Sequence, residues 1–261
     1  MEGGFDVRTA YSVAGKAVIV TGGGTGIGKV YSQRLAEGGA KVVLADIAAE
    51  EANKVAAGLR DQGLEALSIP TDVTNEAAVQ AMADGAAEAF GGIDGLINNA
   101  SMMSVLPRGD WFDIKPERWD AVMSVNLKGI FLCCRAVYPF MKKRGGGRIV
   151  NISSSRVWEG NPNRLDYTTS KAGVIGLTRA LAREVGDDRI GVNAVSPGFT
   201  LSETQLATSS SNYTAGKEDG KCFKRPQVPD DLVGTVMFLL SDASSFMTGQ
   251  TINVDGGTYM H

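Results

Sequence analysis

Residues 17–28 read AVIVTGGGTGIG, and the interpretation of the whole chain starts from them. Ala17–Val20 is a run of apolar residues typical of a buried strand, and a glycine-rich turn follows it directly. A helix is predicted from Gly28 to Gly38, where a glycine ends it. A strand, a glycine turn and a helix in this order expose backbone N–H groups and a helix N-terminus, which together suit a phosphate group.

The same alternation of short apolar runs and longer amphipathic stretches continues along the chain. Further strands are predicted at Lys41–Ala45, Ala66–Ile69, Gly95–Asn98, Gly147–Ile152, Ile190–Val195 and Gln250–Val254. Further helices are predicted at Ala48–Gln62, Asn75–Phe90, Trp119–Lys142 and Tyr167–Glu184. Wholly apolar strands that alternate with helices indicate a parallel sheet covered on both faces. The predicted fold class is therefore α/β: a Rossmann-like, doubly wound parallel sheet of about seven strands in a single domain, residues 1–261.

Two segments lie outside this alternation. Residues 1–14 form an N-terminal extension before the first strand. Residues 198–229 are polar and rich in Ser, Thr, Gly and Lys, and a connection of this length is either a functional lid or a disordered excursion. Because ligands of open α/β sheets bind outside the carboxyl ends of the strands, we expect residues 199–228 to form a substrate lid.

The composition excludes several classes of function. Apolar residues make up 43% of the 261 and charged residues 21%, with a net charge of −3, so no basic stripe indicates a nucleic-acid partner. No uninterrupted apolar run reaches the ~18 residues of a membrane span, so no membrane partner is expected. Of three cysteines, Cys133 and Cys134 are adjacent, which predicts a reducing, cytoplasmic location. The single histidine, His261, argues against most zinc sites and a Ser-His-Asp triad, so no metal site is expected.

Two nucleotide interpretations compete for the glycine turn. Gly23–Lys29 fits the first seven positions of a P-loop, but Val30 stands where Ser or Thr should hold Mg²⁺. A dinucleotide site explains more, because Asp46 ends the second strand about twenty residues further on, where a carboxylate accepts hydrogen bonds from ribose hydroxyls. A 2′-phosphate would meet like charge at Asp46, so NAD(H) is predicted over NADP(H).

A dinucleotide site needs a proton donor or acceptor at the substrate oxygen. Tyr167 and Lys171 are four residues apart on a predicted helix, which puts both side chains on one face. A tyrosine ordinarily has a pKa near 10, and a nearby ammonium group lowers it. The pair is therefore a candidate acid/base unit.

Taken together, the chain resembles the short-chain dehydrogenase/reductase family from about Lys16 to Gly257. The matching motifs are Thr21-Gly22-x-x-x-Gly26-x-Gly28, Asp72-Val73, Asn98-Asn99-Ala100, Asn126, Ser154, Tyr167-x-x-x-Lys171 and Pro197-Gly198. Where the family often has glycine after the asparagine pair and alanine, this chain has Ser101.

The resemblance implies a catalytic tetrad. Tyr167 would be the acid/base, and Ser154 would hydrogen-bond the substrate oxygen. Lys171 would lower the tyrosine pKa and bind the nicotinamide ribose, and Asn126 would hold a water that links the lysine to solvent.

The serine is assigned by spacing, and the cofactor contacts follow from the motifs. Ser154 precedes Tyr167 by thirteen residues, the usual interval of the family, while Ser153 and Ser155 remain alternatives. The residues assigned to the cofactor are Gly22, Thr25, Gly26, Ile27, Gly28, Asp46, Ile47, Asp72, Val73, Asn98, Ala100, Tyr167, Lys171, Pro197, Gly198 and Thr200.

The substrate pocket is expected to have mostly apolar walls. With Ser154, the residues assigned to it are Met102, Arg156, Trp158 and Phe199. Such walls suit an apolar ketone or secondary alcohol, aryl or cyclic, although Arg156 leaves an acidic substrate group open.

The leading hypothesis is thus an NAD-dependent alcohol dehydrogenase/ketone reductase, which the resemblance implies to be a homotetramer. One alternative is a 3-ketoacyl (acyl-carrier-protein) reductase, which usually uses NADPH and a basic docking face; Asp46 and the pI of about 5.3 count against it. The other is a catalytically idle NAD-binding sensor or scaffold.

Overall fold

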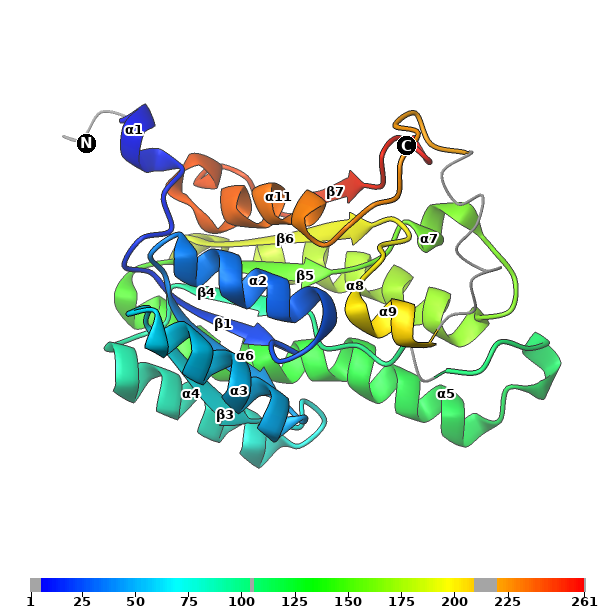
Figure 1. Ribbon diagram of the computed structural model, residues 1–261, viewed down its shortest axis with the longest axis horizontal. Coiled ribbons are helices and arrows are strands. Elements are labelled where there is room, and N and C mark those ends of the chain that lie inside the picture. The colour runs from blue at the N-terminus through cyan, green and yellow to red at the C-terminus, as the bar shows by residue number, and fades with distance from the viewer. Residues whose placement is uncertain (1–5, 104–105, 209–219, 261) are drawn as a thin grey trace.

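A parallel seven-stranded sheet forms the centre of the structure (Figure 1). The structure is a computed structural model that describes residues 6–103, 106–208 and 220–260. Its strands are β1 (Ala17–Thr21), β2 (Lys41–Asp46), β3 (Ala66–Pro70), β4 (Gly95–Asn98), β5 (Gly147–Ile152), β6 (Ile190–Pro197) and β7 (Thr251–Val254). Every neighbouring pair is parallel, and the spatial order is β3-β2-β1-β4-β5-β6-β7. The predicted α/β fold class is confirmed.

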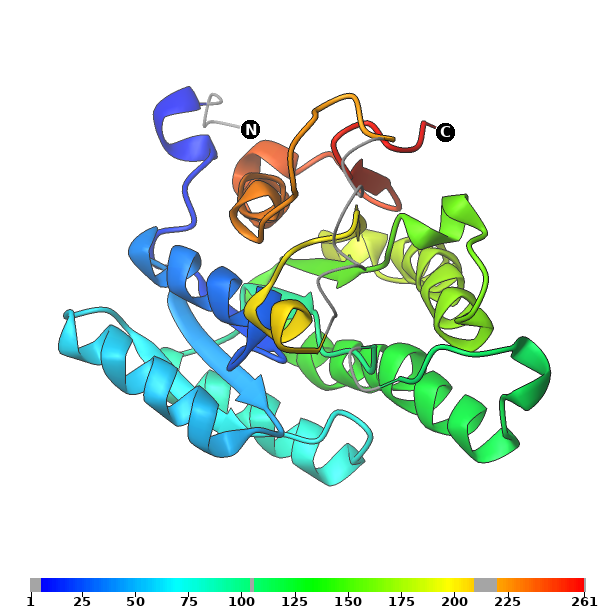
Figure 2. The ribbon, with the colours of Figure 1, turned by 45° about the vertical axis from the view of Figure 1, so that its right-hand side comes forward.

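Helices cover both faces of the sheet (Figure 2). One face carries α2 (Gly26–Glu37), α3 (Ala49–Asp61) and α11 (Asp230–Leu240). The other carries α4 (Glu76–Phe90), α6 (Gly129–Arg144) and α8 (Leu165–Glu184). Shorter elements are α1 (Val7–Ala10), α5 (Pro116–Met123), α7 (Arg156–Glu159), α9 (Glu203–Thr208) and single turns at Trp111–Asp113, Gly186–Asp188 and Asp242–Ser244.

Helix α11 was not predicted from the sequence. It buries Leu232, Val236, Leu239 and Leu240 against the sheet, a spacing of i, i+4, i+7 and i+8 that marks one face of a helix. The polar stretch before it hid this signal, because the long connection was expected to run on as loop.

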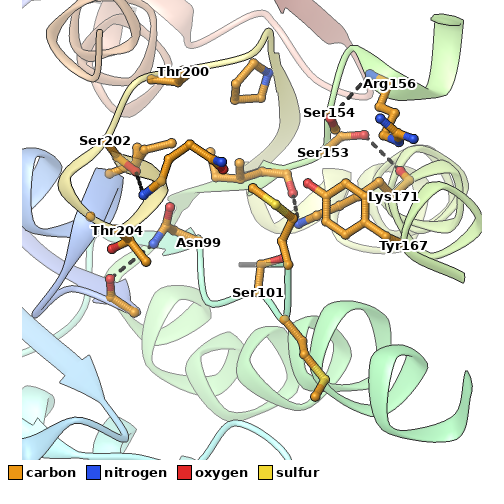
Figure 3. A pocket seen from close by; sticks show the side chains of 18 of the residues that line it. Asn99, Ser101, Ser153, Ser154, Arg156, Tyr167, Lys171, Thr200, Ser202 and Thr204 are labelled. Carbon is orange, nitrogen blue, oxygen red and sulfur yellow. Dashed lines mark hydrogen bonds between the residues drawn. The ribbon is translucent and has the colours of Figure 1, made fainter. Parts of the chain in front are cut away.

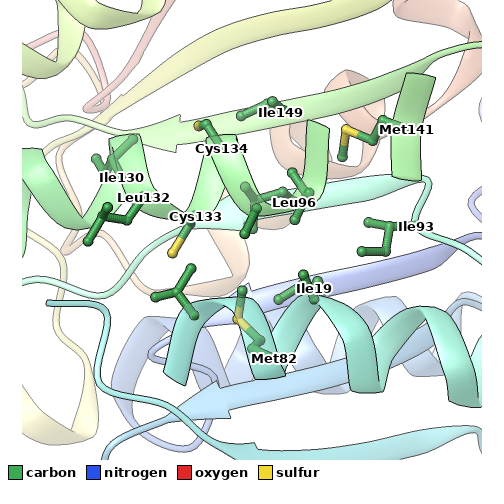
Figure 4. Close-up of a cluster of buried hydrophobic side chains, with 14 of the residues drawn as sticks. Ile19, Met82, Ile93, Leu96, Ile130, Leu132, Cys133, Cys134, Met141 and Ile149 are labelled. Carbon is green, nitrogen blue, oxygen red and sulfur yellow. The ribbon is translucent and has the colours of Figure 1, made fainter. Parts of the chain in front are cut away.

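A buried apolar layer joins the sheet to α4 and α6 (Figure 4). Leu96 of β4 and Ile149 of β5 face Met82 of α4 and the cysteine pair of α6. Burial raises the pKa of the Cys133 thiol above its ordinary range and that of Cys134 to about 12. Both thiols therefore stay protonated and act as small apolar side chains in this layer.

The helix predicted at Trp119–Lys142 is longer and is interrupted by a wider turn. Helix α5 continues into a π-helical turn at Ser124–Lys128 and then into α6. By length and composition, Pro116–Arg144 is apolar enough to cross a membrane, which the sequence analysis did not expect. Half of its most apolar window is buried in the protein, as in the core helix of an α/β fold. π-turns frequently lie at functional sites, and this one carries Asn126.

Part of the predicted N-terminal extension packs onto the sheet layers. Ala10 and Val13 are buried, and the ring of Tyr11 lies 6.3 Å from that of Phe238 on α11. Residues 1–5 of the extension lie outside the described residues.

The strand order places the binding crevice. Strands β1 and β4 are neighbours, and the chain winds outward from them in opposite directions. Ligands of open α/β sheets bind at such a switch point, outside the carboxyl ends of the strands.

The central position of Leu96 makes it a test of this core. Leu96→Ala should lower the free energy of unfolding by ~2–5 kcal/mol because it leaves a cavity under α4 and α6. At ~2–4 °C per kcal/mol, calorimetry should show a Tm lower by ~5–15 °C. The control is Leu206→Ala, whose side chain is 57% exposed. Equal Tm changes for the two variants would contradict the described core.

Candidate active site

A cavity of about 850 Å³ opens at the carboxyl ends of the strands. The loops after β1 to β6 all contribute to its walls, as the switch-point argument requires. The predicted site residues that line it are Gly22, Thr25, Gly26, Ile27, Asp46, Ile47, Asp72, Val73, Ala100, Met102, Ser154, Arg156, Tyr167, Lys171, Pro197, Gly198, Phe199 and Thr200. Gly28, Asn98, Asn126 and Trp158 do not line it.

The glycine turn requires glycine for two physical reasons. Gly22 and Gly26 have φ values of +63° and +55°, in the left-handed region. A Cβ at Gly28 would lie 1.9 Å from the carbonyl oxygen of Gly22, so only glycine lets α2 start this close to the turn. Gly28 thus lets the start of α2 pack closely against the turn, although Gly28 does not itself line the cavity. Asn99 secures the same loop by donating from Nδ2 to the carbonyl oxygens of Thr21 and Gly22, at 3.0 and 3.2 Å.

Asp46 ends β2 beside this turn and is 6% exposed. Its Oδ2 accepts from the Gly24 N–H at 2.8 Å, and its Oδ1 accepts from the Ala48 N–H at 2.9 Å. Each carboxylate oxygen can accept further hydrogen bonds, so the group keeps capacity for ligand hydroxyls. The glycine turn and a negative charge are therefore held rigidly at one end of the cavity.

Tyr167, Lys171 and Ser154 meet at the other end (Figure 3). The first turns of α8 carry Tyr167 and Lys171, and the lysine Nζ lies 5.8 Å from the centre of the tyrosine ring. Lys171 is 1% exposed and donates from Nζ to the Ile152 carbonyl oxygen at 2.8 Å. Ser154 lies beside the Tyr167 side chain and favours its ionised form, which lowers the pKa of Tyr167.

The three consecutive serines have different partners. Ser153 donates from Oγ to the Lys171 carbonyl oxygen at 2.8 Å, which ties the end of β5 to α8. Ser155 is 6% exposed, and its backbone N–H donates to the Pro197 carbonyl. Because Ser154 lines the cavity and is the serine that acts on the tyrosine hydroxyl, the structure favours the Ser154 assignment over both alternatives.

Burial shifts both titrating groups toward their neutral forms. Burial raises the pKa of Tyr167 above its usual 10, and the Ser154 hydroxyl and the charges of Arg164 and Arg156 oppose this rise. Burial lowers the pKa of Lys171 to about 7. Near neutral pH the tyrosine is thus a protonated hydroxyl, able to give a proton to a substrate oxygen.

Asn126 is fully engaged within the protein. Its Oδ1 accepts from the Met102 N–H at 2.7 Å and from Ser101 Oγ at 3.2 Å. Its Nδ2 donates to Ser170 Oγ at 3.0 Å and to the Met102 carbonyl at 3.3 Å. These four bonds use both donors and both lone pairs of the side-chain amide, and the water expected at Asn126 stays a prediction. Asn126 holds the loop after β4 against α8.

Asn98 and Trp158 also lie elsewhere than expected. Asn98 is 2% exposed and donates from Nδ2 to Asn151 Oδ1 at 2.8 Å, beneath the cavity floor. Its chain neighbour Asn99 is the one that lines the cavity, because successive residues at a strand end point in opposite directions. Trp158 lies on α7, outside the cavity lining.

Sequence reasoning missed an ion pair that supports the tyrosine. Asp166, which is completely buried, accepts from Arg118 Nε at 2.7 Å and from the Tyr167 backbone N–H at 2.8 Å. An acidic residue in the first turn of a helix was the available signal, but Arg118 is 48 positions away.

A second missed contact joins the expected lid to the glycine turn. Glu203 of α9 accepts from the Gly26 N–H at 3.2 Å and pairs with Lys29 Nζ at 2.9 Å. The described part of the segment also contributes Thr204 and Gln205 to the cavity wall. Residues 209–219 of the expected lid lie outside the described residues.

The fold and the cavity define an enzyme of the dinucleotide-binding α/β class, with a Tyr-Lys-Ser group at the reacting end. The model of the family described as enoyl-(acyl carrier protein) reductase matches residues 22–259. The chain belongs to the short-chain dehydrogenase/reductase family and is an oxidoreductase of that type. This membership confirms the resemblance and removes the P-loop alternative.

Named relatives and solved structures span several substrates. An uncharacterized oxidoreductase of Mycobacterium tuberculosis (strain ATCC 25618 / H37Rv) is 43% identical over 93% of this chain and 96% of its own. A probable galactose dehydrogenase of Rhizobium meliloti (strain 1021) is 41% identical, over 94% and 95%. A 7α-hydroxysteroid dehydrogenase complexed with NADH and 7-oxo glycochenodeoxycholic acid superposes with a TM-score of 0.91 at 31% identity, over 97% of this chain and 98% of that one.

The buried Lys171 predicts a specific pH dependence of stability. Since its pKa falls from 10.5 to about 7 on folding, the unfolded chain holds a proton between those values that the folded chain lacks. The free energy of unfolding should therefore rise with pH across that window. Lys171→Met removes this dependence, so its stability relative to the wild type should fall steadily from pH 7 to pH 9.

Chemical denaturation at both pH values measures this gap. Lys143→Met, which removes an exposed lysine, should show a gap that does not change with pH. The same constancy in Lys171→Met would mean that the Lys171 pKa is not lowered.

Proposed function

We propose that the protein transfers hydride between NAD(H) and a secondary alcohol or ketone with an apolar, aryl or cyclic, body. The observation that carries this proposal is the Tyr167 side chain, beside Ser154 and the buried Lys171, in the same cavity as the glycine turn. One end of the cavity is built for a dinucleotide, and the other for proton transfer to or from an oxygen.

The residues present fit NAD(H). The turn at Gly22 and Gly28 is a cradle that side chains would fill, and Asp46 presents a carboxylate where ribose hydroxyls are expected. When bound, the nicotinamide supplies the hydride acceptor or donor. A 3-ketoacyl-(acyl-carrier-protein) reductase from Brucella melitensis complexed with NADH superposes with a TM-score of 0.87 at 32% identity, over 95% of this chain and 100% of that one, which supports the choice.

The chain's own residues account for binding and proton transfer at the substrate oxygen. Ser154 Oγ and the Tyr167 hydroxyl hold this oxygen between them. In reduction, Tyr167 gives its proton to the oxygen; in oxidation, it takes the hydroxyl proton. Lys171 orders this end through its bond to Ile152, and we assign to it the contact with the nicotinamide ribose.

The walls near the tyrosine support an apolar substrate body. Met102, Met103 and Phe199 line this part of the cavity. Relatives and structural neighbours include enzymes for hydroxysteroids and 3-oxoacyl chains, and a probable galactose dehydrogenase. The 7α-hydroxysteroid dehydrogenase, which is complexed with a 7-oxo compound, supports the reaction class proposed.

A second candidate is a 3-oxoacyl-(acyl-carrier-protein) reductase. A Staphylococcus epidermidis protein of that name is 36% identical over 255 residues. Asp46 and the net charge of −3 favour the first candidate, because they disfavour NADPH and an acidic carrier protein. Turnover of any ketone would exclude the remaining alternative, a catalytically idle NAD-binding sensor or scaffold.

The organisation of the protein is proposed with its function. We take residues 1–261 as one catalytic unit with the extension at residues 1–14 and a substrate lid at about 199–228. We further propose that it works as a cytoplasmic homotetramer.

Removal of the tyrosine hydroxyl tests the catalytic assignment. Tyr167→Phe should lower kcat by about 10²–10⁴-fold in NADH oxidation with a panel of aliphatic, cyclic and aryl ketones, because general acid catalysis is lost. NADH binding, followed by its fluorescence, should stay within about twofold. Tyr11→Phe removes a hydroxyl from an exposed ring and should match the wild type. Activity retained by Tyr167→Phe would refute the assignment.

The role of Asp46 is tested by cofactor choice. Asp46→Ala should reduce the preference for NADH over NADPH at least ~10-fold, because the repulsion of a 2′-phosphate disappears. Asp46→Asn removes the charge and keeps an acceptor for only one of the Gly24 and Ala48 N–H groups, because the second carboxylate oxygen becomes an NH2 donor. If both variants lose activity equally with NADH and with NADPH, the preference is unchanged and Asp46 only supports the loop.

A further inference from the structure

The reacting end of the cavity carries two arginines, Arg156 and Arg164, and one carboxylate, that of Glu159. Arg156 and Arg164 line the cavity, and both charges favour the phenolate of Tyr167. They therefore lie close enough to the tyrosine to act on the oxygen that the substrate would contact. Charges in a buried, low-dielectric site act more strongly than they would in water.

Arg156 is held by neutral groups only. Its Nη2 donates to the carbonyl oxygens of Asn161, at 2.9 Å, and Pro162. Within residues 6–103, 106–208 and 220–260, no carboxylate forms an ion pair with it, and its Nε is buried without a hydrogen-bond partner. A buried N–H without a partner is costly, and a charge-assisted hydrogen bond is about twice as strong as a neutral one.

The nearest acidic side chain on the same helix is engaged elsewhere. Glu159 is one turn from Arg156 on α7, yet it hydrogen-bonds Asn161 Nδ2 and the Tyr259 hydroxyl. Burial and this carboxylate raise the pKa of Tyr259 to about 12, so the phenol remains a donor to Glu159. Glu159 lines the same cavity as Arg156, but within the described residues the two side chains form no ion pair.

Arg164 gives the same region a fixed second charge. It is 8% exposed and donates to the carbonyl oxygens of Met103 and Leu106 at 3.1 and 3.3 Å. These bonds hold its guanidinium at the wall that carries Met102 and Met103, the apolar side of the same pocket. A ligand here meets apolar surface and positive charge together.

We infer that the substrate is an oxo acid or hydroxy acid, whose carboxylate binds Arg156 while its apolar body lies along Met102 and Met103. This inference rests on the proposed function and narrows its substrate class. Arg156 follows Ser154 by two residues, and its backbone N–H donates to Ser154 Oγ at 3.3 Å, so both residues lie on one loop beside the cavity (Figure 3). The distance between carboxylate and reacting carbon is therefore varied in the experiment.

Matched acid and ester substrates test the inference directly. The probes are benzoylformate, benzoylacetate and 3-benzoylpropionate, each beside its methyl ester, with NADH as reductant. They place the carboxyl carbon one, two or three bonds from the ketone carbon while the aryl body stays the same. The wild type should favour at least one acid over its ester by about tenfold or more in kcat/KM, because only the acid gains the charge-assisted bond.

Arginine variants separate binding from a structural role. In Arg156→Gln the acid-to-ester ratio should fall by about 10–100-fold, whatever happens to the rate with the ester. Arg156→Lys should give an intermediate ratio, because it keeps the charge but loses the planar fork. Arg179→Gln, at an exposed position of α8 outside the cavity, makes the same change in net charge and should leave the ratio unchanged.

Two results would overturn the inference: esters favoured over acids at all three lengths, or an acid-to-ester ratio unchanged in Arg156→Gln. If none of the six probes is turned over, that failure bears on the proposed function, and the binding of the acids is then measured alone. The Tm of the enzyme–NADH complex should rise with an acid, not with its ester, and only when Arg156 is present. No such acid-specific rise would overturn the inference as well.

Discussion

The buried amine of Lys171, bonded to the carbonyl oxygen of Ile152, holds the reacting end of the cavity together. Ser153, which follows β5 directly, donates a hydrogen bond to the Lys171 carbonyl oxygen. Lys171 therefore connects the sheet to α8 through both its side chain and its backbone. Asp166 fixes the start of the same helix through Arg118. Tyr167 lies between these two attachments, and the position of its hydroxyl follows from them.

The same burial sets the chemistry of the pair. A lysine with a pKa of about 7 is only partly charged near neutral pH, so much of the positive field at the tyrosine comes from Arg164 and Arg156. Burial favours the neutral phenol, and these charges favour the phenolate. The balance leaves a tyrosine suited to giving a proton, and a bound cationic nicotinamide would shift it toward accepting one.

The features that could be predicted from the sequence are those formed by residues close to one another along the chain. The glycine turn, the strands and the Tyr167–Lys171 pair are local patterns, and the structure has each of them. The saturated amide of Asn126 and the pairing of Glu203 with Gly26 depend on residues 24 to 177 positions apart, for which a single sequence carries no signal. Asn98 was misjudged because the direction of a side chain at a strand end depends on the residue at which the strand stops.

The two ends of the cavity differ in how they hold negative charge. At the glycine turn, backbone N–H groups and the N-terminus of α2 suit phosphate, and Asp46 repels any extra phosphate beside them. Beside the tyrosine, the guanidinium groups of Arg156 and Arg164 attract a small anion. Glu203 and Lys29 form the ion pair that links the proposed lid to the turn. Because their side chains are 54% and 32% exposed, this pair adds only about 0.2–1 kcal/mol to the stability of the contact. In the proposed lid, a contact this weak would leave the opening of α9 energetically accessible, as a site that exchanges two different ligands requires.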